Sequence, residues 1–309
     1  MKKQSFSGLI SIIIPVYNAA GTIKACIESC IHQTYYRIEI VVIDDGSTDE
    51  SGRICEQFAD DKRVKIIHQT NMGRTEARWK GVENATGEWI TFVDADDTLL
   101  PFAIEKMAEK ADESCDIVFS NGRSITSKPQ ESMDIKAFRH LTVLAQGTIG
   151  VPWGSLYRKA IVNRYQFDIA RDIYVGEDYI FWLRLIFNTE KNINIVMENL
   201  YNKGIDHTSS MFVWTLDYAY RLNQLRMQAI PVHDLSLYLP DTITDRLANL
   251  SAITLHEIRK NWQNHPFFTD ILSDIKLSGY QIGIKQRLFF HLPCQWLRRI
   301  YSRFSDFLH

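Results

Sequence analysis

The chain has 309 residues, of which 45% are hydrophobic and 23% are charged, so it can bury a core and is not expected to be intrinsically disordered. Its formal net charge of −2 provides no overall positive field of the kind that binds nucleic acid. Its 5 cysteines are too few and too scattered for a disulfide framework, and an odd number fits a reducing compartment.

The first apolar run has to be distinguished from a secretion signal. Lys2 and Lys3 precede the run at 9–16, but the run is short and β-branched, and it contains Pro15. We interpret it as a buried strand, and the sequence has no run of 18 apolar residues that would span a bilayer. In the absence of an export signal, we expect the protein in the cytoplasm.

The first third of the chain alternates between β-branched runs and helical patterns. The short runs predict strands at 9–16, 38–43, 64–67, 89–93 and 116–119. Helical patterns lie at 23–31, 73–86 and 101–113. A further helix is expected directly after 47–50, which have the spacing of a capping box. This alternation predicts an α/β fold with a mostly parallel sheet that helices cover on both faces.

The rest of the chain has a weaker pattern. Residues 122–150 are polar and predict an irregular loop, and a helix is expected at 179–187. From about residue 213 the pattern is helical, with breaks expected near Pro231, Pro240, Pro266 and Pro293.

Polar residues follow three of the predicted strands. In a parallel sheet, ligands bind outside the carboxyl ends of the strands. The segments at these ends are Tyr17-Asn18, Asp44–Ser47 and Asp94–Asp97. Their convergence on one edge predicts a binding site there.

Three carboxylates lie within the four positions Asp94–Asp97. Like charges repel one another unless a cation or hydrogen bonds stabilise them. A divalent metal bound by one or two carboxylates and by phosphate oxygens is one solution. The alternative is a solvated turn that leads into a helix, because Asp is common in turns.

Three other segments each allow two interpretations. Residues 44–49 either form a turn that caps a helix or place a carboxylate against a base or a ribose. Arg78 lies near a helix start and either binds a phosphate or pairs with a surface glutamate. Glu177 and Asp178 precede an apolar helix and act either as caps or as a general base for an acceptor hydroxyl.

Taken together, these motifs resemble glycosyltransferase family 2, the inverting type with the GT-A fold that serves bacterial cell-surface polysaccharide synthesis. The matching stretches are 11–18, 41–49, 71–78, 87–97 and 176–178. The resemblance implies a Rossmann-like GT-A domain at 8–212, with a nucleotide-sugar half at 8–121 and an acceptor half at 122–212. Residues 213–309 lie beyond it and are expected to form a helical region that contacts a membrane or a second subunit.

The resemblance also implies a nucleotide-diphospho-sugar donor, usually a UDP-sugar, and a divalent metal, Mn²⁺ or Mg²⁺. The positions that would bind the donor are Pro15, Tyr17, Asp45, Arg78, Asp94, Lys203 and His207. Among them, Asp45 would accept a hydrogen bond from the uracil and Asp94 would face the ribose. Asp96 would hold the metal that bridges the diphosphate. Asp178 would be the catalytic base, and Glu177 would shape the acceptor side.

Two positions depart from the family pattern. Trp79 stands where the family often has Asn, and Ser155 stands where it often has Lys. We expect the first change to alter packing and the second to affect the choice of acceptor.

The reaction implied by the resemblance is a direct displacement with inversion at the sugar C1, toward a glycan or lipid-linked acceptor in capsule, lipopolysaccharide or exopolysaccharide synthesis. A sugar nucleotidyltransferase is the alternative enzyme, but residues 17–21 make a poor phosphate loop. A non-catalytic glycan- or nucleotide-binding scaffold is a further alternative, and the intact carboxylates argue against it. The basic and aromatic residues of 280–309 suit the inner face of a membrane, with a helix docked on the core or a dimer contact as the alternatives.

Overall fold

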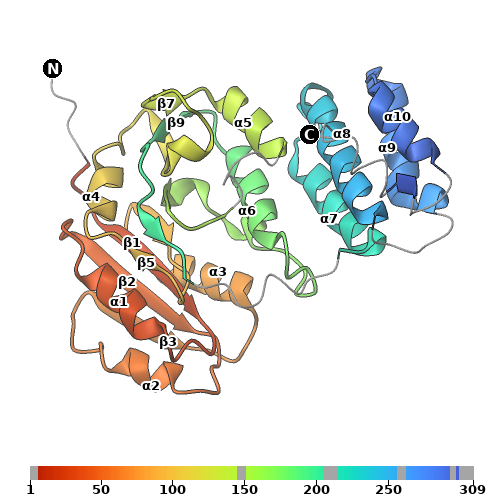
Figure 1. Cartoon of the computed structure of the whole chain (residues 1–309). Coiled ribbons are helices and arrows are strands. Elements are labelled where there is room, and N and C mark those ends of the chain that lie inside the picture. The colour runs from red at the N-terminus through yellow and green to blue at the C-terminus, as the bar shows by residue number, and fades with distance from the viewer. Residues whose placement is uncertain (1–5, 145–150, 205–213, 256–261, 293–296, 299–309) are drawn as a thin grey trace. The chain divides into compact units, whose positions relative to one another are not determined.

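The computed structural model of the chain describes residues 6–144, 151–204, 214–255, 262–292 and 297–298. The chain divides into two compact units, one made of residues 1–142 and 146–207 and the other of residues 143–145 and 208–309. The first unit contains the sheet and the second is helical (Figure 1).

An eight-stranded sheet forms the centre of the first unit. Its strands, in spatial order, are β3 (Val64–His68), β2 (Ile38–Asp44), β1 (Ile10–Val16), β4 (Trp89–Phe92), β8 (Ser155–Arg158), β6 (Cys115–Phe119), β9 (Asn192–Ile195) and β7 (Ser132–Met133). The pairs β3–β2, β2–β1, β1–β4 and β6–β9 are parallel, whereas β8 runs antiparallel to β4 and β6, and β7 runs antiparallel to β9. The predicted α/β fold with a mostly parallel sheet is therefore confirmed.

The β-branched runs form the central strands because both faces of the sheet are covered. Every residue of β1 is buried, and β2 is buried at all positions but one. Because β1 lies between β2 and β4, the carboxyl ends of these three strands meet at one edge, as predicted. A second, two-stranded sheet pairs β5 (Thr98–Leu99) with β10 (Tyr201–Asn202) just beyond this edge.

Six α-helices belong to the sheet-containing part of the chain that the structure describes: α1 (Ile23–Ile31), α2 (Ser51–Glu56), α3 (Arg74–Asn84), α4 (Ala103–Ala108), α5 (Ile135–Val143) and α6 (Glu177–Ile186). Helix α1 buries the predicted face, including Cys26 and Cys30, which are free thiols. Short 3₁₀ turns lie at 122–124, 159–161 and 164–166.

Two predictions in this unit are wrong. Residues 122–150 are not simply a loop, because they contain β7 and the amphipathic helix α5, whose Phe138 is fully buried. The predicted capping box at 47–50 does not form: α2 begins at Ser51, and the Ser47 hydroxyl accepts a hydrogen bond from the backbone N–H of Asn18.

The helical unit contains α7 (Leu216–Ala229), α8 (Leu235–Thr254), α9 (Pro266–Ser278) and α10 (Ile284–His291), with a 3₁₀ turn at 262–264. Pro266 starts α9, where the missing N–H of proline costs nothing. Pro240 lies inside α8, so the break expected there is wrong. The helix continues because Tyr238, Leu239 and Ile243 on either side of the proline are buried. Pro293 lies outside the described residues. None of the helices described by the structure has the length and hydrophobicity needed to cross a membrane.

Candidate active site

The loops after β1 and β2 are tied to each other. The backbone of Asn18 has a left-handed φ of 50°, which Asn tolerates, and its N–H donates to Ser47 Oγ at 3.1 Å. The Asn18 side-chain oxygen accepts from the N–H of Thr48 at 2.8 Å. Tyr17 is exposed beside this junction, and Pro15 is buried within β1. Both residues therefore lie at the predicted edge, and their contact with a base stays a prediction.

Asp45 connects the end of β2 to the start of α3. Its Oδ1 accepts hydrogen bonds from Gln69 Nε2 at 2.7 Å and from the N–H of Met72 at 2.8 Å. Its Oδ2 accepts from the N–H of Gly73 at 2.8 Å. Gly46 follows with a φ of 71°, and a Cβ there would lie 2.7 Å from the backbone nitrogen of Asn71. Asp45 is thus buried and bonded within the chain, while its recognition of uracil stays a prediction.

Arg78 lies on α3 and bridges two carboxylates from distant segments. Its Nη2 donates to Asp94 Oδ1 at 2.8 Å, and its Nη1 donates to Asp178 Oδ1 at 2.6 Å, 100 residues further along the chain. Burial alone would lower the pKa of Arg78, but Asp178 and Asp94 raise it above the usual value for arginine. The alternative of a surface arginine paired with a surface glutamate is therefore wrong, because Arg78 is buried between two site acids.

Glu177 and Asp178 form the first turn of α6, after Gly176 with its φ of 88°. Asp178 points its Oδ1 toward Arg78 and keeps 22% of its side chain exposed. Glu177 is buried, with its Oε1 2.9 Å from Arg74 Nε. Burial, together with the negative charge of Asp178, raises the pKa of Glu177 to about 7, although Arg74 and Arg78 act in the opposite direction. Two neighbouring acids thus lie in different electrostatic environments.

The acidic turn after β4 is held by Tyr201, a residue that sequence reasoning missed. The Tyr201 hydroxyl accepts from the N–H of Asp94 at 2.9 Å and is hydrogen-bonded to the Asp97 carboxylate. Asp97 Oδ1 also accepts from the N–H of Gly204 at 2.5 Å. Trp153 stacks on the ring of Tyr201 at 4.4 Å between centroids. No local pattern marks Tyr201, since it lies 107 residues after Asp94 in the sequence.

The three acids of this turn differ in environment. Burial, together with the charges of Asp96 and Asp94, raises the pKa of Asp97, although the hydrogen bonds from Tyr201 and Gly204 act against this rise. Asp94 is paired with Arg78, whereas Asp96 is exposed. The turn is therefore more than a solvated lead into a helix.

The donor set around Asp96 suits a metal that takes most of its ligands from a substrate. Among the described residues, no group of three His, Cys, Asp or Glu side chains is placed to hold a metal ion. Mg²⁺ and similar ions are commonly bound through one or two carboxylates, with phosphates and waters completing the shell. An exposed carboxylate beside two other acids fits that mode of binding, and Asp96 as the metal ligand stays a prediction.

Lys203 and His207 were predicted to lie near the diphosphate. Lys203 is exposed and directly precedes Gly204, whose backbone packs so closely on the carbonyl of Asp96 that a side chain would not fit. Lys203 thus belongs to the segment that covers the acidic turn. His207 lies outside the described residues.

Comparison with known sequences gives one family. The family model described as Glycosyl transferase family 2 matches residues 11–172. EpsH of Bacillus subtilis, which carries a glycosyltransferase name, is 34% identical over 215 residues, covering 65% of this chain and 62% of EpsH. Glycosyltransferase GlyA of Streptococcus pneumoniae is 32% identical over 234 residues, covering 67% of this chain and 32% of GlyA. The chain thus spans less than two thirds of the length of either relative.

Solved structures share the fold. TarS 1–349 of S. aureus, in complex with UDP-GlcNAc, matches with a TM-score of 0.67 and 21% identity over 87% of this chain and 81% of that chain. The mannosyltransferase PcManGT of Pyrobaculum calidifontis, in complex with GDP-Man and Mn²⁺, matches with a TM-score of 0.56 and 14% identity over 99% of this chain and 90% of that chain. Identities this low establish a common fold and nothing further.

Proposed function

Because the chain belongs to glycosyl transferase family 2, as its motifs predicted, we propose that it is an inverting glycosyltransferase that moves a sugar from a nucleotide-diphospho-sugar to a glycan or lipid-linked acceptor. A UDP-sugar is the donor we favour, and the UDP-GlcNAc complex of TarS supports that choice by analogy of fold. We propose further that the enzyme acts in cell-surface polysaccharide synthesis. The transferred group is a hexosyl or an N-acetylhexosaminyl group, and a screen of donors distinguishes the two.

The observation that carries this proposal is the Arg78 bridge. It holds the first acid of the turn after β4 and an acid at the start of α6 on one buried guanidinium. A buried ion pair is a weak source of stability, because desolvation offsets most of the Coulomb attraction. An arrangement of this kind is better explained by chemistry that needs both carboxylates in one site.

In the proposed reaction, Asp178 is the general base. The hydrogen bond from Arg78 occupies Oδ1, which leaves Oδ2 to take the proton of the acceptor hydroxyl. The acceptor oxygen forms a bond to the sugar C1 while the bond from C1 to the diphosphate oxygen breaks on the opposite face. One base suffices, because a single displacement with inversion has no covalent intermediate. Glu177, buried beside Asp178, shapes the acceptor side.

The remaining groups act on the donor. Asp94 is proposed to face the ribose, Asp45 and the rim at Tyr17 to lie against the base, and Lys203 and His207 to lie near the diphosphate. Asp96 would hold a Mn²⁺ or Mg²⁺ ion, which when bound supplies Lewis-acid stabilisation of the leaving diphosphate. Asp97, tied to Tyr201 and Gly204, keeps the backbone of this turn in place.

Release of UDP from UDP-sugars, with and without Mn²⁺, tests the proposal. Asp178→Asn should keep UDP-sugar binding in calorimetry and lose transfer activity. Near-normal transfer by this variant would show that Asp178 is not the general base. Asp96→Ala should weaken UDP binding only when the metal is present, and an unchanged affinity with metal would contradict its assignment. Asp60→Asn, an exposed acid of the same unit, is the matched control.

A parallel assay with UTP and a sugar phosphate separates the alternative functions. A sugar nucleotidyltransferase would release pyrophosphate from UTP and a sugar phosphate, whereas a glycosyltransferase releases UDP. A non-catalytic scaffold would bind UDP-sugar and release neither product. A screen of UDP- and GDP-sugars then identifies the donor.

Helix α10 carries the proposed membrane contact. Phe289 is fully buried, and Phe290 packs on Trp262, so this part of the 280–309 segment docks on the helical unit. The opposite face exposes Ile284 at 78% and Leu288 at 53%, on either side of Lys285 and Arg287. An apolar pair flanking basic residues suits an anionic membrane surface, which would place the enzyme beside a lipid-linked acceptor.

A further inference from the structure

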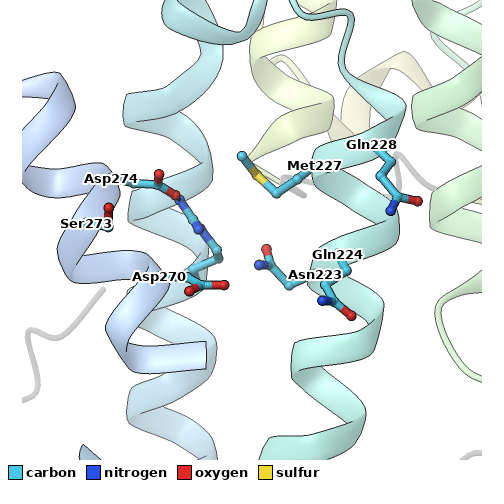
Figure 2. Close-up of a pocket in the computed structure, with 8 residues that line it drawn as sticks. Asn223, Gln224, Met227, Gln228, Asp270, Ser273 and Asp274 are labelled. Carbon is cyan, nitrogen blue, oxygen red and sulfur yellow. The ribbon is translucent and has the colours of Figure 1, made fainter. Parts of the chain in front are cut away.

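A solvent-open cavity of about 350 Å³, lined by polar side chains together with Met227, lies between α7, α8 and α9 of the helical unit (Figure 2). The side chains that line it and that bear on its chemistry are Asn223, Gln224, Arg246, Asp270, Ser273 and Asp274. A volume of this size is at the lower end of the range for small-molecule sites. None of these residues has a part in the proposed transfer reaction.

Arg246 forms a fixed wall of the cavity. Its guanidinium is buried, and its Nη2 donates to Asp274 Oδ2 at 2.7 Å, from α8 to α9. Its Nε donates to the carbonyl oxygen of Thr242 at 3.2 Å. Because Nε and Nη2 are both held within the chain, the guanidinium keeps a constant orientation at the wall of the cavity.

Asn223 supplies the observation that points to a ligand. The residue is 5% exposed, and its Oδ1 has no hydrogen-bond partner within the described part of the chain. Figure 2 shows its side chain reaching from α7 into the space in front of Asp270. A buried carbonyl oxygen without a partner costs stability, so such groups call for an explanation. A ligand that donates a hydrogen bond here would satisfy it.

The lining also selects the kind of ligand. Carboxylates and the Asn223 oxygen accept hydrogen bonds, while Arg246, Gln224 and Ser273 can donate them. Two acids face one arginine, so the cavity carries a surplus negative charge that disfavours anions. Neutral hydroxyl groups, each both a donor and an acceptor, match this surface best.

We propose that the cavity binds one unit of a neutral saccharide, with Asn223 Oδ1 and Asp270 accepting from its hydroxyls and Arg246 donating to them. The site is separate from the transfer chemistry. It gives the helical unit a role in holding a glycan.

Saturation-transfer NMR on the full chain, with UDP present in excess to occupy the donor site, tests this site. The probes are methyl β-D-glucoside, methyl β-D-N-acetylglucosaminide and the anionic methyl β-D-glucuronide. We expect at least one neutral probe to bind with a millimolar Kd, and the glucuronide to bind at least about tenfold more weakly. No signal from either neutral probe, or equal binding of the glucuronide, would overturn the proposal.

Two variants assign the signal to the cavity. Asn223→Leu should weaken binding of the neutral probe by about tenfold or more, with a Tm equal to or above that of the parent, because it removes an unpaired buried oxygen. Asp270→Asn, at an exposed position, should keep neutral binding and abolish the discrimination against the glucuronide. Asn249→Leu, exposed on α8 outside the cavity, is the matched control. Neutral binding that persists in Asn223→Leu, or discrimination that persists in Asp270→Asn, would overturn the assignment. Because these experiments measure binding without turnover, their outcome does not depend on whether the protein has transferase activity.

Discussion

Replacing Glu177 with Gln should stabilise the protein at alkaline pH and leave its stability unchanged at acid pH. Glu177 is buried, and burial together with the charge of Asp178 raises its pKa to about 7, from a usual value of 4.5. Above pH 7 the folded protein must therefore hold a carboxylate that is poorly solvated and close to another negative charge. Glutamine has the shape of the protonated acid and carries no charge at any pH.

The sign and size of the effect follow from proton linkage. Between pH 4.5 and about 7 the folded state keeps a proton on Glu177 that the unfolded chain has lost, so the free energy of unfolding falls as pH rises. The contribution of this group is fully present below pH 4.5 and is lost above about pH 7. At 1.36 kcal/mol per pKa unit, the loss is about 3 kcal/mol. The Gln variant should show no such loss, so its advantage over the parent should grow to about 3 kcal/mol at pH 8.

Urea denaturation from pH 4 to pH 8.5, followed by circular dichroism, measures this difference. Glu39→Gln is a control of opposite sign. Burial alone would raise the pKa of Glu39, but hydrogen bonds from Ser11, Thr86 and Gly87 lower it overall. Glu39→Gln should therefore cost more stability at pH 8 than at pH 4. If Glu177→Gln lowers the urea midpoint at pH 8, or if its effect does not grow with pH, the electrostatic account of Glu177 is wrong.

Three other variants test the site and the helical unit. Arg78→Met should lower the free energy of unfolding of the first unit by about 3–5 kcal/mol in urea denaturation, because it leaves the carboxylates of Asp94 and Asp178 without their cationic partner. A loss below about 1 kcal/mol would show that the fold does not need this bridge. Tyr201→Phe should cost about 1–3 kcal/mol and raise the Kd for UDP in the presence of Mn²⁺, because the N–H of Asp94 loses its acceptor; an unchanged Kd would show that Tyr201 does not position the acidic turn. Replacing the exposed Ile284 and Leu288 by Glu should abolish flotation with anionic liposomes while leaving the fold intact. Equal flotation of the variant and the parent would show that these residues do not bind the membrane.

The central strands and the gathering of acidic residues at one edge of the sheet were predictable because their signals are local. The β-branched runs of β1 and β2 are buried on both faces. A strand of that kind belongs in the interior of a parallel sheet that helices cover on both faces. Once β1 lies between β2 and β4, the acids after β2 and β4 must share an edge. The position of the acidic residues therefore follows from the order of the elements, without knowledge of any side-chain contact.

The partners of these acids were not predictable, because they come from distant parts of the chain. Arg78 carries the same local signal as a solvated helix arginine, and its partner on α6 lies 100 residues later in the chain. Tyr201 sits in a two-residue strand with no periodicity to mark it. Helix α5 was missed for a related reason: its polar flanks hide a short apolar face that becomes evident only when Phe138 meets Phe119 and Trp182.

Helix α3 connects the segment after β2 with the acids at the start of α6, two parts of the site that are far apart in the sequence. Asp45 holds the two backbone N–H groups that precede the helix, while Arg74 and Arg78 on its first turns reach Glu177 and Asp178. A short helix moves as a rigid body, so a shift at Asp45 would be transmitted to the α6 acids through both arginines. The end of β2, where the base is proposed to bind, is thus mechanically connected to the proposed catalytic base. We therefore predict that weakening the Asp45 hydrogen bonds impairs transfer even where Asp178 itself is intact.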